Sequence, residues 1–137
     1  SACLVGSEMC IRDRIKLLIK NQHMIFQFYL LPEIYVFTKS LDFNKHSLLF
    51  FNESNYNMSI IEKKKAIKLK IDFTFESRCI KLLSKTKLTD VGISSKITSV
   101  LASNNIPCNI ISGYENDYFF VPFNDGLKAF KVLSSLS

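Results

Sequence analysis

The stretch of sequence that decides the fold is IPCNIISGYENDYFFVPF, residues 106–123. It holds two apolar runs, Cys108–Gly113 and Tyr118–Phe123, separated by the polar segment Glu115–Asp117. β-Branched and aromatic residues favour strands, and a polar segment between two such runs is typical of a turn. The sequence therefore predicts a β-hairpin, and Pro107 keeps any preceding helix from continuing into it.

The segments around the hairpin predict an α+β unit. Apolar residues recur with helical spacing between Ser94 and Asn105, and Asp125 precedes a second apolar-faced helix at the C-terminal end. Upstream, Arg78–Leu83 reads as a strand. Each helix has one apolar stripe, so both must cover the same face of an antiparallel sheet. This is a ferredoxin-like order that lacks its last strand, and we expect Ile34–Thr38 to supply it.

The pattern before residue 78 is weaker. It predicts a helix over Ile15–Leu31 ended by Pro32, a strand over Ser47–Phe51, a helical spacing from Met58 to Ala66, and a half-buried strand over Lys68–Phe75. Residues 1–14 show no sustained period, so we interpret them as a non-native or disordered extension that contributes nothing to the core.

Composition excludes several classes of function. The net charge is +6, but the lysines are scattered, which indicates a solvated surface and no nucleic-acid partner. The four cysteines form no CxxC pair and there are two histidines, so no metal site of recognisable spacing and no cofactor is predicted. No apolar stretch approaches the ~20 residues of a membrane span. Without a signal sequence, we expect a cytoplasmic protein with reduced thiols.

The sequence also carries a resemblance to a known family. Part of the chain resembles the C-terminal module of small bacterial tandem-ACT proteins. The segments that carry the resemblance are Leu88–Ile93, the helix after it, Ile106–Tyr114 and Phe119–Pro122. The modules of these proteins are similar to those of aspartate kinases and CASTOR-type arginine sensors. Their divergent first module is similar to Tyr35–Phe37 and Ser47–Phe51. The resemblance implies two ACT-like modules, over residues 15–77 and 78–137. The family's hairpin usually carries histidines where this chain has Glu115–Tyr118.

The resemblance implies a regulatory, non-catalytic protein that binds an amino acid or similar small metabolite, as a homodimer, where two modules meet. Its usual contact is the loop before the first helix. Here that loop leads into a helix N-terminus, which favours the carboxylate of a ligand. Asp90 could hold the ammonium group of the ligand, and Gly92 permits the ligand to approach the backbone closely. The candidate ligand-binding residues are Thr89, Asp90, Val91, Gly92, Ile93, Asn109, Ile110 and Ser112.

Other interpretations stay open at this point. Asp90 could simply cap the helix, Gly92 could serve only the turn, and Asn109 could face solvent. A structural dimerisation module without a ligand is the alternative function. An RNA-binding module of the same topology would need a basic residue and a glycine beside the aromatic residues of its central strand. The segment Tyr118–Phe123 has the aromatic residues but no Lys, Arg or Gly. An enzyme is disfavoured because no nucleophile–base pair can be placed together.

Overall fold

Among the residues that the structure describes, the framework is a six-stranded antiparallel sheet. The computed structural model describes residues 26–84 and 90–136, so that the proposed extension over residues 1–14 and the candidate residue Thr89 lie outside the described residues. The strands are β1 (Phe28–Ser40), β2 (Leu49–Asn52), β3 (Asn57–Glu62), β4 (Thr74–Leu82), β5 (Asn109–Ser112) and β6 (Asp117–Pro122). The helices are α2 (Lys63–Lys68), α3 (Ile93–Ser103) and α4 (Gly126–Ser134), preceded by the 3-10 turn η1 (Phe123–Asp125).

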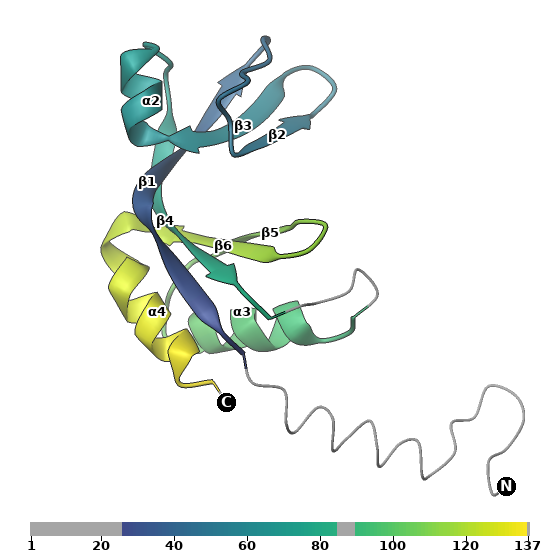
Figure 1. Cartoon of the computed structure of the whole chain (residues 1–137), viewed down its shortest axis with the longest axis vertical. Coiled ribbons are helices and arrows are strands. Elements are labelled where there is room, and N and C mark those ends of the chain that lie inside the picture. Colours follow the sequence, from purple (N-terminus) through teal and green to yellow (C-terminus); the bar gives the residue numbers. More distant parts are fainter. Residues whose placement is uncertain (1–25, 85–89, 137) are drawn as a thin grey trace, which may run out of the picture.

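The strand order, β2-β3-β1-β4-β6-β5, is symmetric about its central pair. β1 and β4 lie in the middle, the β2–β3 hairpin flanks one side, and the β5–β6 hairpin flanks the other (Figure 1). The prediction that an earlier strand completes the C-terminal sheet is confirmed, because β1 pairs with β4 along most of its length. The predicted C-terminal hairpin and the helices on either side of it are also confirmed.

The predicted helix over Ile15–Leu31 is wrong from Phe28 onward, where the chain is already in β1; residues 15–25 lie outside the described residues. Pro32 does not end a helix but lies in an irregular stretch of the strand, where the pairing with β4 shifts between Leu30 and Ile34. Proline cannot donate a hydrogen bond to a neighbouring strand, so within a sheet it is tolerated at such bulges.

Two further predictions before residue 78 are wrong. The helical spacing from Met58 to Ala66 covers β3, and a helix begins only at Lys63. Ile60 and Ile61 are both fully buried because β3 is covered on both faces, which removes the alternation of a half-buried strand. The predicted strand over Lys68–Phe75 is a helix end and a connection before β4 begins at Thr74, and Ile71 N donates back to Ala66 O at 2.9 Å.

The two faces of the sheet differ. On the helix face, α3 and α4 cover a core that includes Ile80, Leu101 and Phe119, and α2 covers Val36 and Ile61. The other face carries the inner cluster, defined by Tyr35, Ile60, Cys79 and Phe120. Leu49 of β2 and Ile111 of β5 line one hollow of about 160 Å³ against this cluster, although their strands are the two edges of the sheet. The sheet is therefore strongly curled (Figure 1).

Gly126, the first residue of α4, lies directly against β4. A Cβ atom there would stand 2.7 Å from Arg78 Cγ and 2.9 Å from Arg78 Cβ. Arg78 cannot easily move, because its Nη2 donates to Leu31 O at 3.0 Å. We expect Gly126→Ala to lower the free energy of unfolding by about 1–3 kcal/mol, as overpacking does, in a urea titration.

The matched control is Leu127→Ala, one residue further along the same helix turn, where the side chain is exposed. Its effect is expected to stay within about 0.5 kcal/mol. If Gly126→Ala were as stable as the parent protein, the contact between α4 and Arg78 would not be close.

Candidate functional site

The predicted ligand loop leads into α3 as a left-handed turn. Gly92 has φ +83° and precedes Ile93, the first helical residue, and the backbone of Lys96 donates to Gly92 O at 3.0 Å. No side chain of the described residues caps this helix end, and its first turn contains no acidic residue. Within the described residues, the first N–H groups of α3 therefore have no capping side chain, and a helix N-terminus of this kind favours an anion.

The residues around Gly92 leave room for a ligand. Val91 is 94% exposed and Asp90 is exposed. Apart from Gly92 and its two chain neighbours, no heavy atom of the described residues lies within 4 Å of the position that a Cβ of Gly92 would take. Ile93 turns inward and packs against the core on the helix face. Glycine suits this position because a left-handed backbone is strained for other residues.

The candidate residues of β5 divide between the two faces of the sheet. Ile110 pairs with Phe119 and packs against the same core as Ile93, on the helix face. Ser112 shares that face because side chains alternate along a strand. Asn109 pairs with Phe120 of the inner cluster and therefore lies on the opposite face. The structure does not place Asn109 and Ser112 beside one common space.

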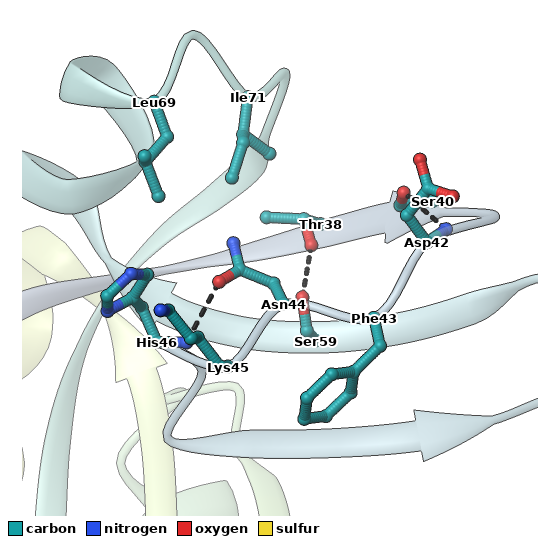
Figure 2. A pocket seen from close by; sticks show the side chains of 10 residues that line it. All are labelled: Thr38, Ser40, Asp42, Phe43, Asn44, Lys45, His46, Ser59, Leu69 and Ile71. Atoms are coloured by element: carbon teal, nitrogen blue, oxygen red, sulfur yellow. Dashed lines mark hydrogen bonds between the residues drawn. The ribbon is translucent and has the colours of Figure 1, made fainter.

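A second group of polar side chains, which the sequence did not reveal, surrounds a hollow of about 570 Å³ on the helix face beyond α2 (Figure 2). The residues that line it come from β1, β3, the connection after β1 and the connection after α2. They are Thr38, Ser40, Asp42, Phe43, Asn44, Lys45, His46, Ser59, Leu69 and Ile71. Residues 42–46 are consecutive, but only the folded chain brings them to the side chains of β1, β3 and the connection after α2, so no sequence signal joins the whole group.

The described residues offer little to metal or thiol chemistry. Burial raises the pKa of Cys79 to about 12 and that of Cys108 to about 11, so both thiols stay protonated and weakly nucleophilic near neutral pH. Within residues 26–84 and 90–136, no group of three or more His, Cys, Asp or Glu side chains is arranged to hold a metal ion. Over the same ranges, no helix has the length and apolar character needed to cross a membrane.

Comparison with known protein families gives one match, which lies in the C-terminal half. Residues 74–135 match the family model described as ACT domain. No curated protein sequence matches the chain. The segment 74–135 therefore has an ACT-type α+β fold, and it contains every described residue of the predicted ligand site.

Solved structures extend the likeness beyond that segment. A protein of unknown function from Vibrio cholerae, described as a possible transport protein, aligns with 89% of this chain and 94% of its own at 21% identity and a TM-score of 0.71. The aspartate kinase of Clostridium acetobutylicum aligns with 82% of this chain and 34% of its own, at 16% identity and a TM-score of 0.59. The regulatory subunit of aspartate kinase from Thermus thermophilus aligns with 80% of this chain and 97% of its own, at 7% identity and a TM-score of 0.54. At these identities the likeness concerns the fold.

Proposed function

We propose that the protein is a non-catalytic regulator that binds an amino acid or a similar small metabolite. The observation that carries the proposal is the ACT match to residues 74–135, which includes α3 with its open N-terminus. The fold shared with a regulatory subunit of aspartate kinase supports it, since that subunit aligns over nearly its whole length.

The proposal includes two ACT-like modules that share one sheet. β4 is followed by α3, the β5–β6 hairpin and α4; β1 is followed by the β2–β3 hairpin and α2. Each hairpin flanks the central pair from its own side. The solved structures align with 80% or more of the chain, which is more than residues 74–135 provide. Residues before Thr74 would then form the divergent module.

The binding site in this proposal is the loop Asp90–Ile93. The N–H groups of α3 meet the ligand carboxylate, and Asp90 meets the ammonium group. Ser112 is the polar β5 residue that shares the face of α3, whereas Asn109 lies on the other face. A second protomer in a homodimer would close the site from outside.

The proposal is tested with a thermal-shift screen against the twenty amino acids, because a ligand that binds the folded state raises the melting temperature. Calorimetric titration then compares the parent with Asp90→Ala. A charge-assisted hydrogen bond contributes about 1.5–3 kcal/mol, so we expect the substitution to weaken binding about ten- to a hundredfold.

The control is Asp72→Ala, which removes the same charge from an exposed side chain in the connection before β4. It is expected to bind like the parent. Gly92→Val is a weaker test, because a β-branched residue at φ +83° strains the backbone whether or not a ligand is near. Equal affinity in the parent and in Asp90→Ala would place the site elsewhere.

A dimerisation module without a ligand is the second candidate, and the sheet edges favour it. Among the described residues, β2 pairs only with β3 and β5 only with β6, so each strand leaves one side of its backbone open. Such edges can pair with another chain. A screen without any stabilising amino acid, together with a dimer in light scattering, would favour this second function.

A further inference from the structure

The two halves of the sheet differ in one element. In the C-terminal half, α3 stands between β4 and the β5–β6 hairpin. In the N-terminal half, residues 41–48 connect β1 to β2 without a helix. Within residues 26–84 and 90–136, no helix takes the place over β1 and β3 that α3 has in the other half, and the hollow of Figure 2 occupies this position.

The floor of the hollow carries two buried hydroxyl groups. Thr38 and Ser59 are cross-strand partners, each only 5% exposed, and their hydroxyl oxygens lie 2.6 Å apart. The bond between them uses one of the two hydroxyl hydrogens. Neither hydroxyl has another hydrogen-bond partner within the described residues. Because a buried donor without an acceptor destabilises a protein, this floor favours a ligand that accepts a hydrogen bond.

The connection after β1 adds further donors. The Asn44 side-chain oxygen accepts a hydrogen bond from His46 N at 2.9 Å, which turns the amide NH2 group toward the hollow (Figure 2). Lys45 lines the same end of the hollow and carries a positive charge. The carboxylate of Asp42 lies at the far end, beside Ser40. The end near Asn44 and Lys45 is therefore rich in donors and positively charged.

The opposite wall is apolar. Leu69 and Ile71, from the connection after α2, point down toward Thr38 and Asn44 (Figure 2). The volume of about 570 Å³ falls within the range of small-molecule sites, and the lining combines an apolar wall with a few polar groups.

We propose that this hollow binds a small aliphatic carboxylate. Its carboxylate accepts hydrogen bonds from Lys45 and Asn44, its hydrocarbon part packs on Leu69 and Ile71, and the free hydroxyl hydrogen of the floor points to it. A phosphate dianion fits less well, because Lys45 is matched by the negative charge of Asp42 at the other end, and because the apolar wall offers nothing to a phosphate. The site is separate from the loop Asp90–Ile93 and does not rest on the regulatory function.

The test uses 4-methylpentanoate as the probe and 4-methylpentanamide as its neutral analogue, titrated into the full chain labelled with ¹⁵N. We expect saturable shifts of the backbone amides of Asn44, Lys45 and Ser59, with a dissociation constant in the micromolar to millimolar range. The amide analogue is expected to bind at least tenfold more weakly, since it loses the charge-assisted bonds. Shifts confined to residues near Gly92 would place the carboxylate in the other site and overturn the proposal.

Two variants separate binding from folding. Lys45→Gln removes a charge from an exposed side chain, and we expect a loss of at least tenfold in affinity; Lys131→Gln, on α4, removes the same charge elsewhere and should change nothing. The double variant Thr38→Val and Ser59→Ala removes both hydroxyls together, which leaves no orphaned donor and should weaken binding with the fold intact. The absence of saturable binding, unchanged affinity in Lys45→Gln, or equal binding of the neutral amide would each refute the site.

Discussion

A fragment of residues 74–137 is expected to stay unfolded in isolation, although it contains the whole segment that matches the ACT domain. β4 would lose β1, its neighbour in the centre of the sheet. The core on the helix face would lose Phe26, Phe28 and Leu30, which all come from the missing part. Far-UV circular dichroism and the dispersion of amide resonances measure the result.

A rearranged chain provides the control. α4 contacts β1, and Leu136 packs against the same core as Phe28, so the C-terminal end lies near the start of β1 (Figure 1). Joining residues 26–40 to the end of the fragment through a flexible Gly/Ser linker should restore a cooperative thermal transition. A fragment that folds cooperatively without β1 would show that the C-terminal segment is independent of the first half.

The C-terminal half could be predicted from the sequence because the residue pattern of each helix and strand indicates which of its sides is buried. α3 and α4 each have one apolar stripe, and two apolar runs separated by a polar turn indicate a hairpin. The need for a strand from elsewhere followed from the same order, since one sheet edge was missing. β1 fills that place, and its pairing with β4 depends on contacts between residues more than forty positions apart, such as Tyr35 and Ser77.

The first half could not be predicted because its pattern depends on tertiary contacts. β3 is buried on both faces, so its apolar run imitates a helix, and α2 has only six residues. Pro32 signals a helix end in isolation, but a bulge in a long strand accommodates it equally well. Local patterns cannot distinguish these cases, since the deciding partner is a strand elsewhere in the chain.

The two candidate sites differ in the same way. The loop Thr89–Ile93 was predicted as a ligand site because the resemblance to ACT modules implies a contact there, and because Gly92 precedes the N-terminus of an amphipathic helix. The hollow in the first half depends on the register that places Thr38 opposite Ser59 and on a connection that takes the place of a helix. Neither condition appears in a residue pattern, so only the structure reveals it.

Phe120→Ala is expected to lower the free energy of unfolding by about 3–5 kcal/mol. Phe120 belongs to the inner cluster, which contains residues from both halves of the sheet. Its side chain is 1% exposed, and its ring stacks edge-on with Tyr35 at 6.1 Å and with Phe37 at 5.6 Å between centroids. Both partners belong to β1, whereas Phe120 belongs to β6. Because a domain is stable by only about 5–15 kcal/mol, the melting temperature should fall by roughly 10–20 °C.

The matched control is Phe51→Ala, the same substitution on the edge strand β2, where the side chain is 57% exposed. It is expected to cost less than about 1 kcal/mol. Urea titration of both variants and the parent measures the loss of stability. The number of unfolding transitions also shows whether the two halves of the sheet unfold together. If the inner cluster joins the two halves into one cooperative unit, Phe120→Ala should still unfold in a single transition at lower urea. Two separate transitions would instead mean that the halves fold independently and that Phe120 stabilises only its own.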